Sequence, residues 1–308
     1  MTIYPDLSDA FIADRLTHPR SGRLDVILDT DTANELDDQF ALAWAVLSKD
    51  SINLQAVHVA PYFNDRSDSP ADGQQKSFAE AKAVLEALGE TQIPVVAGSE
   101  EYLPDKETPV DSPAARDLVR RAMERSPEDP PLYVATIGCV TNAASAILLE
   151  PAIIDRIVIV MLGGQDFEWP TAREFNLQQD IPAVQVLFES GVPIVQISAV
   201  RQALSLGLTY PEVKEYVKGC GEIGDLLADR YEEQSNLTPG YRRPIWDLSA
   251  IAWIINPDWA KSTLRPRPNL TDDAYWSDNF FGKPMRQVVL LDVSGIFMDL
   301  FAKLKTLR

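Results

Sequence analysis

The sequence predicts an α/β fold, with an open, mostly parallel sheet and helices on both of its faces. Short runs rich in β-branched residues alternate with amphipathic stretches along the chain, and this alternation favours a parallel sheet covered by helices. The chain has 308 residues, of which 45% are hydrophobic, and this is enough to bury one large core. Because no internal repeat or linker-like tract interrupts the pattern, we expect residues 1–308 to form a single domain.

The strands and helices follow in chain order from the spacing of apolar residues. Strands are expected at residues 24–28, 54–60, 93–97, 132–136, 157–162, 192–197 and 288–293. Helices are expected at residues 40–47, 78–88, 114–123, 141–149, 183–188, 225–233 and 248–255. Gly89 and Gly191 are placed to end two of these helices, and Asp180 is placed to cap the start of one. Ligands of such sheets bind beyond the carboxyl ends of the strands, so a site is expected in the loops after Leu28, Ala60, Ala97, Thr136 and Leu162.

The chain is strongly acidic. Its 28 Lys and Arg residues against 46 Asp and Glu residues give a net charge of −18. This charge would repel phosphate groups, so we expect neither nucleic acid nor an anionic membrane as a partner. No apolar run reaches the roughly 20 residues that a membrane span needs. Most of the excess charge is typical of a solvated surface, and part of it is available for a cation site.

Cysteine and histidine are both scarce. Two cysteines, Cys139 and Cys220, are too few for a disulfide framework, and residues 1–20 lack the basic and apolar pattern of a leader. We therefore expect a cytoplasmic protein. The two histidines, His18 and His58, leave few candidates for the commonest general acid–base group and the commonest zinc ligand.

A dense acidic segment follows the first expected strand. Residues 29–38 read Asp-Thr-Asp-Thr-Ala-Asn-Glu-Leu-Asp-Asp, between a buried strand and a helix. Carboxylates this crowded repel one another unless a cation neutralises them, and hard oxygen ligands suit calcium or magnesium. Asp37 alone would be an ordinary acidic residue at a helix start, where negative charge is favourable. The density of carboxylates at a strand end favours a metal site instead.

Three further segments agree with the acidic one in order and spacing. Residues 136–142 read Thr-Ile-Gly-Cys-Val-Thr-Asn, Gly163-Gly164 is followed by Glu174-Phe175-Asn176, and residues 247–250 read Asp-Leu-Ser-Ala. Together with the Asp-x-Asp and Asp-Asp pairs of residues 29–38, they resemble the motifs of the inosine–uridine type of nucleoside hydrolase. The resemblance covers residues 24–255, and four motifs in register are much more specific than any one of them.

The resemblance implies a nucleoside hydrolase-like fold and calcium-dependent hydrolysis of the N-glycosidic bond of ribonucleosides, in nucleoside salvage. The implied calcium ligands are the side chains of Asp31, Asp38 and Asp247 and the backbone carbonyl of Ile137. The implied ribose ligands are Asp37, Glu174 and Asn176. The small-molecule nucleoside would be the partner, and a homo-oligomer, either dimer or tetramer, is expected. The residue types agree with this, because carboxylates, an amide and calcium all bind vicinal hydroxyls.

The sequence departs from the family in three places. The loop between Asp31 and Asp37 is longer than the usual Pro-Gly form. Residues 165–173 contain no clear counterpart of the asparagine that contacts the sugar's 5′-hydroxyl. The histidines found near the leaving base in pyrimidine-accepting members are absent, and Trp246 stands before the late aspartate, which resembles the purine-specific members. Trp246 could stack on a base or pack in the core.

These features predict a purine-preferring nucleoside hydrolase. Asp31 would accept a proton from the attacking water, and the reaction would pass through an oxocarbenium-like state. Stacking on Trp246 would favour protonation of a purine ring nitrogen by solvent, with Tyr62 or Phe63 as a second aromatic face. Two alternatives remain open at this point. One is a phosphatase of the haloacid dehalogenase type, which Asp29-Thr30-Asp31-Thr32 fits, and the other is a relative that binds nucleoside or ribose without turnover.

Overall fold

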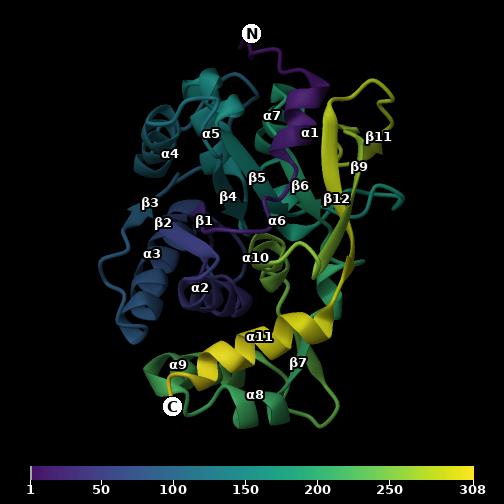
Figure 1. Ribbon diagram of the computed structural model, residues 1–308. Coiled ribbons are helices and arrows are strands. Elements are labelled where there is room, and N and C mark those ends of the chain that lie inside the picture. The colour runs from purple at the N-terminus through teal and green to yellow at the C-terminus, as the bar shows by residue number, and fades with distance from the viewer. Residues whose placement is uncertain (1) are drawn as a thin grey trace.

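The main sheet of the protein has eight strands. The computed structural model describes residues 2–308 (Figure 1), and the strand order is β3-β2-β1-β4-β5-β6-β12-β9. Every neighbouring pair is parallel except β12 and β9, which are antiparallel. The predicted open, mostly parallel sheet is therefore confirmed. Its strands are β1 (Leu24–Thr30), β2 (Ile52–Val59), β3 (Val95–Ala97), β4 (Leu132–Thr136), β5 (Ile157–Leu162), β6 (Ile194–Ile197), β9 (Ala260–Pro266) and β12 (Pro284–Leu291).

Helices cover both faces of the sheet, as predicted. Alternate side chains of β1 point to opposite sides: Val26 and Leu28 join one buried apolar cluster, while Ile27 joins the other. The first cluster contains residues of α2 (Asp37–Leu47), α3 (Pro70–Ala87), α9 (Gly221–Gln234), α10 (Leu248–Ile255) and α11 (Val293–Lys305). The second contains residues of α4 (Pro113–Met123), α5 (Thr141–Leu149) and α7 (Ile181–Ser190).

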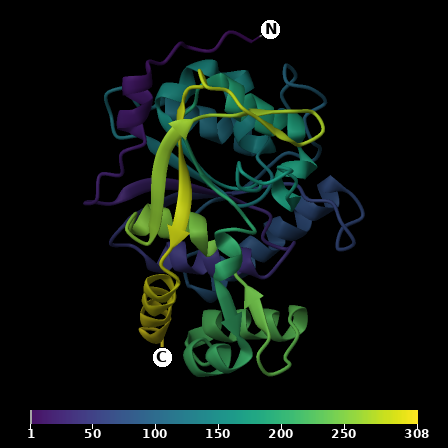
Figure 2. The ribbon, with the colours of Figure 1, turned by 90° about the vertical axis from the view of Figure 1, so that its right-hand side faces the viewer.

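Smaller elements complete the fold. Figure 2 views the molecule from the side of β12 and β9, and shows the small antiparallel pair β7 (Gly207–Thr209) and β8 (Arg242–Pro244) below them. The others are α1 (Asp9–Arg15), η1 (Pro151–Asp155), α6 (Phe175–Gln179), η2 (Ala203–Ser205), α8 (Tyr210–Tyr216), β10 (Asn269–Leu270) and β11 (Trp276–Ser277). Within residues 2–308, none of the helices has both the length and the apolar character that crossing a membrane requires.

The predicted helix ends are confirmed, but the bounds of some helices and strands differ from those predicted. Gly89 and Gly191 adopt φ values of 70° and 84°, and the Asp180 side chain accepts a hydrogen bond from the Ala183 N–H at 3.0 Å. The helix expected from residue 78 begins at Pro70, where the Ser69 side chain caps it. The late strand expected at 288–293 instead runs from residue 284 to 291, because the chain turns there into α11.

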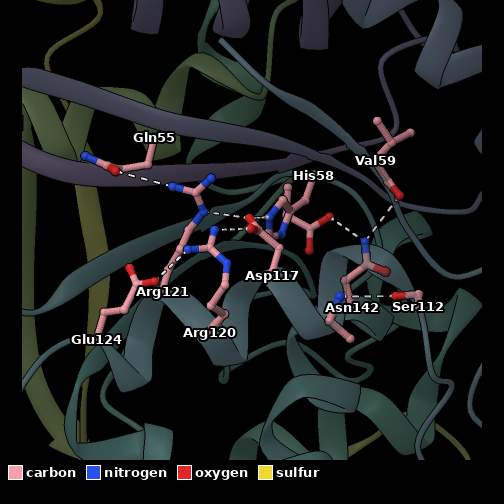
Figure 3. A network of polar contacts seen from close by, with 11 residues as sticks. Gln55, His58, Val59, Ser112, Asp117, Arg120, Arg121, Glu124 and Asn142 are labelled. Carbon is pink, nitrogen blue, oxygen red and sulfur yellow. Dashed lines mark hydrogen bonds and ion pairs between the residues drawn. The ribbon is translucent and has the colours of Figure 1, made fainter.

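A buried charged group joins β2 to α4. His58 lies on β2, and its Nε2 is 2.9 Å from a carboxylate oxygen of Asp117 on α4 (Figure 3). Asp117 also accepts hydrogen bonds from Arg120 and Arg121, at 2.5 and 2.6 Å. Burial lowers the pKa of His58 more than the neighbouring Asp117 raises it. We call His58, Asp117, Arg120 and Arg121 the His58 cluster. In it, two guanidinium groups balance the negative charge of Asp117.

Asn142 connects the carboxyl ends of neighbouring strands. Its amide nitrogen donates to the Val59 carbonyl at 3.2 Å (Figure 3). The same nitrogen donates to Asp29 Oδ1 at 3.0 Å, and the side-chain oxygen accepts from the Ser99 N–H at 2.8 Å. A Cβ on Gly98 would lie 1.9 Å from the Val59 carbonyl oxygen and 2.5 Å from Asn142 Nδ2, so only glycine fits there. The Thr-Asn motif thus has a structural role at this edge of the sheet.

Candidate active site

A pocket of about 340 Å³ opens at the carboxyl ends of the strands. Its walls come from the segments after β1, β2, β4, β5 and β6 and from the segment that leads into α10. This is the edge at which parallel sheets bind their ligands. The lining residues are Asp31, Asn34, Glu35, Asp37, Asp38, Asn64, Ile137, Leu162, Gln165, Glu174, Phe175, Asn176, Ala199, Val200, Trp246 and Asp247. All the metal and sugar ligands expected from the sequence, and Trp246, therefore lie on one pocket.

Three carboxylates at this pocket lie close enough to share one ion. Asp37, Asp38 and Asp247 offer oxygens that all lie within 4.8 Å of one another, and all three side chains are buried. Asp37 and Asp38 begin α2, and Asp247 precedes α10, so two helix N-termini bring them together. Burial raises the pKa of each well above its usual value, and the neighbouring carboxylates raise it further.

Asp31 lies beside this group. Asp31 is 1% exposed, and its charge raises the pKa of Asp38. One Asp31 oxygen accepts a hydrogen bond from the Asn34 amide at 3.1 Å. A Cβ on Gly138 would lie 3.1 Å from the Asp31 backbone nitrogen and from Asp31 Oδ1, so glycine allows the turn after β4 to approach closely. We call Asp31, Asp37, Asp38 and Asp247 the acidic cluster.

The acidic cluster has the chemistry of a hard-cation site. Oδ2 of Asp247 is buried and has no hydrogen-bond partner among residues 2–308. Four buried carboxylates with this arrangement must hold protons or a cation, because unpaired charge is costly away from water. Oxygen donors of this kind fit calcium. The oxygens of Asp37, rather than those of Asp31, complete the triad within 4.8 Å; the assignment of Asp31 to the ion and Asp37 to the sugar stays a prediction.

The predicted carbonyl ligand and the predicted sugar ligands are neighbours. The Asn176 amide donates to the Ile137 carbonyl at 2.7 Å. This hydrogen bond joins the residue directly after β4 to the start of α6. Glu174 caps α6: its oxygens accept from the N–H groups of Asn176 and Leu177, both at 3.1 Å, and from that of Gly164 at 2.9 Å. The capping role considered from the sequence is thus real for Glu174, and its side chain still lines the pocket.

Trp246 packs partly in the core and partly faces the pocket, so stacking on a base stays a prediction. It lies on the pocket wall, and it also packs against the apolar cluster that contains α2 and α10. The guanidinium carbon of Arg243 lies 5.3 Å from the centre of the Trp246 ring. Neither Tyr62 nor Phe63 lines the pocket in the described part of the chain: Tyr62 is buried, with its hydroxyl 3.3 Å from the Ala33 carbonyl, and Phe63 is 54% exposed.

No histidine within residues 2–308 lines the pocket. His58 belongs to the His58 cluster, and His18 Nε2 lies 2.9 Å from the Ile254 carbonyl. Asp29, the first residue of the Asp-x-Asp pair, is also off the pocket. It is 1% exposed, and burial raises its pKa to about 7. A haloacid dehalogenase-type phosphatase would present this aspartate to its substrate, so the geometry argues against that alternative.

Several lining residues were missed from the sequence. They are Asn34, Glu35, Asn64, Leu162, Gln165, Phe175, Ala199 and Val200. The strand-end rule points to Asn64 and Gln165, since each follows an expected strand by a few residues. Asn34 and Glu35 lie in the loop that is longer than the family's usual form. Ala199 and Val200 are apolar and carry no chemical signal, so their place on the wall depends on the tertiary structure.

Comparison with known proteins agrees with this geometry. The sequence profile described as "Inosine-uridine preferring nucleoside hydrolase" matches residues 26–271, most of the chain. The chain belongs to this family. It is accordingly a hydrolase that acts on the N-glycosyl bond of ribonucleosides, and the predicted resemblance is confirmed.

Relatives with known functions come from both specificity groups. The pyrimidine-specific ribonucleoside hydrolase RihA of Escherichia coli is 25% identical over 272 residues, which are 79% of this chain and 83% of that protein. A plant nucleoside hydrolase superimposes with a TM-score of 0.74 at 16% identity, covering 92% of this chain and 99% of that one. A purine-preferring ribonucleoside hydrolase from Gardnerella vaginalis gives a TM-score of 0.70 at 20% identity, covering 92% and 98%. Both superpositions support the fold.

Proposed function

We propose that this protein is a calcium-dependent nucleoside hydrolase that prefers purine nucleosides and releases free base and ribose. The observation that carries the proposal is the acidic cluster. Four carboxylates meet in a buried pocket with no described cation beside them except the Arg243 guanidinium near Asp37. Such a group of oxygens suits a divalent cation and the hydroxyls of a sugar.

In the proposed site, the side chains of Asp31, Asp38 and Asp247 and the carbonyl of Ile137 hold calcium. Held there, calcium would supply the Lewis acidity that lowers the pKa of a water molecule and favours binding of sugar hydroxyls. Asp31 takes a proton from the attacking water. The new bond joins the water oxygen to the anomeric carbon, while the bond from that carbon to the base nitrogen breaks and its electron pair leaves with the base. Solvent returns a proton to the base.

The ribose is held by Asp37, Glu174 and Asn176 in this proposal. Asn176 uses its N–H on the Ile137 carbonyl and keeps its side-chain oxygen for a hydroxyl donor. Glu174 is oriented by three backbone N–H groups, so the carboxylate does not have to be ordered when substrate binds. Contacts that tighten as the sugar ring flattens lower the barrier rather than only the KM.

The purine preference rests on Trp246 and on the lack of a histidine among the pocket residues of the described chain. A stacked purine can take a proton on its imidazole portion, whereas a pyrimidine leaves poorly without a positioned acid. The names of related proteins differ on this point, because the Escherichia coli relative is pyrimidine-specific and the Gardnerella vaginalis structure is purine-preferring. A stacked aromatic pair contributes only about 0.5–1.5 kcal/mol beyond buried area, so Trp246 accounts for part of the rate.

The deciding experiment is a nucleoside panel. Release of free base and ribose is measured for inosine, guanosine, uridine and cytidine, with added calcium and with a chelator, on the wild type and on Trp246→Ala. We expect turnover that the chelator removes, purines faster than pyrimidines, and a larger loss for inosine than for uridine in the variant. Faster uridine turnover would overturn the purine preference, and unchanged turnover in chelator would overturn the calcium requirement.

A further inference from the structure

Glu35 connects two arginines across the mouth of the pocket. One carboxylate oxygen of Glu35 lies 3.2 Å from Arg66 Nη1, and the other accepts a hydrogen bond from Arg243 Nη2 at 2.7 Å. The Glu35 side chain is 30% exposed and lines the pocket, while Arg243 is 12% exposed. Both oxygens of Glu35 are therefore already engaged by a guanidinium, and neither is left to pass a proton to a leaving group.

The two arginines come from different segments of the chain and lie behind the lining residues rather than among them. Arg66 follows β2, and its Nη1 also donates to the Asn34 carbonyl at 2.5 Å, while its N–H donates to Asn64 Oδ1 at 2.9 Å. Asn64 in turn donates to Asn34 at 2.7 Å. Arg243 lies on β8, in the segment that leads to Trp246. Glu35 thus joins the loop after β1 to the loop after β2 and to the segment before α10.

The Arg243 guanidinium lies against the ring of Trp246, with its carbon 5.3 Å from the ring centre. Glu35 accepts the hydrogen bond that orients this guanidinium, and Arg243 Nε is buried without a partner among residues 2–308. Without the Glu35 charge, Arg243 would lose the hydrogen-bond acceptor that orients its guanidinium. The guanidinium would then no longer be held against the Trp246 ring.

We propose that Glu35 is a positioning residue, which holds Arg66 and Arg243 across the pocket mouth and so fixes Trp246 as the wall for the leaving base. The inference rests on the proposed function, and it places the control of specificity at the base end of the nucleoside. Glu35 lies in the loop between Asp31 and Asp37, which is longer in this chain than the family's usual form. The sugar and the acidic cluster lie deeper, on other side chains, so the effect of Glu35 should depend on the leaving group.

The test compares leaving groups on one sugar. Steady-state kcat and KM are measured for inosine, uridine and 4-nitrophenyl riboside on the wild type, Glu35→Gln, Arg243→Lys and the double variant. Calcium affinity is measured by calorimetry for each. Nitrophenolate departs without protonation and needs no fixed stacking wall. We expect Glu35→Gln to lower kcat/KM for inosine by roughly 10–100-fold, the usual effect of removing a group that orients a functional residue.

The same variant should lower kcat/KM for 4-nitrophenyl riboside much less. Because the Glu35 charge also acts on Asp31, Asp37 and Asp38, both substrates are compared at saturating calcium. Arg243→Lys keeps the charge but loses the planar guanidinium, so it should reproduce the inosine loss, and the double variant should add little to either single change. Glu189→Gln is the matched control, because Glu189 pairs with Lys106 at 2.8 Å, is half exposed and does not line the pocket. It should behave as wild type.

The possible outcomes distinguish a failure of the positioning role from a failure of the proposed function. Equal losses for all three substrates in Glu35→Gln, or no loss for inosine, would overturn the positioning role while the wild type remains a working hydrolase. Additive losses in the double variant would show that Glu35 and Arg243 act separately, and would also overturn it. A wild type that releases ribose from no nucleoside and from no 4-nitrophenyl riboside would instead overturn the proposed function, and the inference with it.

Discussion

Two groups of charged side chains lie against the main sheet, and they differ in how their charges are matched. In the His58 cluster, Asp117 contacts two arginines and a histidine (Figure 3). In the acidic cluster, four buried carboxylates face one another. The pKa values move in opposite directions: that of Asp117 is lowered by its donors, and those of the acidic cluster are raised by burial and mutual repulsion.

The comparison teaches how to separate structural from functional charge. A matched group stabilises the fold and needs nothing from outside, so its place between β2 and α4 is sufficient explanation. A group of buried carboxylates without cationic partners costs free energy in the isolated chain. It is tolerated where a ligand or an ion restores the balance of charge. Burial alone does not distinguish them, because His58 and Asp31 are equally inaccessible to solvent.

The largest expected effect follows from neutralising one unmatched carboxylate. Asp38→Asn should abolish hydrolysis and weaken calcium binding by more than the roughly 10–100-fold that outer-shell partners contribute. It should also raise the stability of the metal-free protein at neutral pH, because one repelling buried carboxylate is gone. Calorimetric calcium titration and chemical denaturation in chelator measure the two effects. Wild-type calcium affinity in the variant would remove Asp38 from the site.

Asn176→Ala should have the next largest effect, on the sugar side of the same pocket. We expect kcat/KM to fall by roughly 10–100-fold while calcium still binds, because the amide donates to the Ile137 carbonyl and, in the proposed site, its oxygen accepts from a sugar hydroxyl. Steady-state kinetics with inosine, together with calcium titration, test this. Wild-type kcat/KM would make Asn176 a purely structural residue.

Calcium should stabilise the wild-type fold by relieving the unmatched charge. At a free concentration of about 100 times its Kd, the ion should add about 2.7 kcal/mol to the free energy of unfolding. Thermal melts in calcium and in chelator measure this, and Asp38→Asn serves as the control that should show little change. An equal gain in the variant would place the bound ion elsewhere.

Neutralising Asp117, the carboxylate that arginines balance, should lower the stability and leave the activity unchanged, which is the reverse of the effects expected for Asp38→Asn. Asp117→Asn should lower the free energy of unfolding by about 1–3 kcal/mol, since His58 and two arginines lose their charged partner. Its kcat/KM at a temperature where it is folded should equal that of the wild type. Urea denaturation and inosine hydrolysis give the two numbers. A large loss of activity in folded protein would mean that the His58 cluster is coupled to the pocket.

The smallest expected effect is a pH dependence of the same cluster. Because burial lowers the pKa of His58, the unfolded chain binds a proton below about pH 6.5 that the folded chain does not. Stability from this residue is therefore present above pH 6.5 and is lost as the pH falls, by at most about 2 kcal/mol at pH 5. The stability gap between wild type and His58→Gln should narrow from pH 7.5 to pH 5. A gap that widens would show that the folded histidine is charged.

Much of the fold and the pocket could be predicted because the signals are local. Apolar periodicity gave the strands β1 to β6 and the helices between them, and the strand-end rule pointed to the loops after them. The resemblance to the family motifs then singled out Ile137 and Glu174. The motif at residues 247–250 identified Asp247, which periodicity alone would have left as a helix cap. The small sheet β7–β8 was not expected because each of its strands has only three residues. The edge strand β9 was not expected because most of its side chains are exposed or half-buried, which leaves no apolar run.

The contacts that shape the pocket mouth could not be read from the sequence. Glu35 and Arg243 are 208 residues apart, and nothing in their local pattern connects them. Asp29 and Asp31 are identical residues two positions apart, yet only Asp31 lines the pocket, because Asp29 is buried within β1 and Asp31 lies beyond the carboxyl end of that strand. Such distinctions depend on tertiary packing, which the motifs imply only in outline.

The arrangement of Glu35, Arg66 and Arg243 has an evolutionary consequence. Glu35 and Arg66 lie in loops and Arg243 lies on the short strand β8, whereas the groups proposed to act on the sugar are set by strand ends and helix starts of the main fold. Insertions and exchanges in the loops can therefore accumulate without disturbing the buried machinery. A lineage could acquire a different base preference by remodelling its rim while inheriting the same ribose chemistry unchanged, which would account for purine-preferring and pyrimidine-specific proteins on one scaffold.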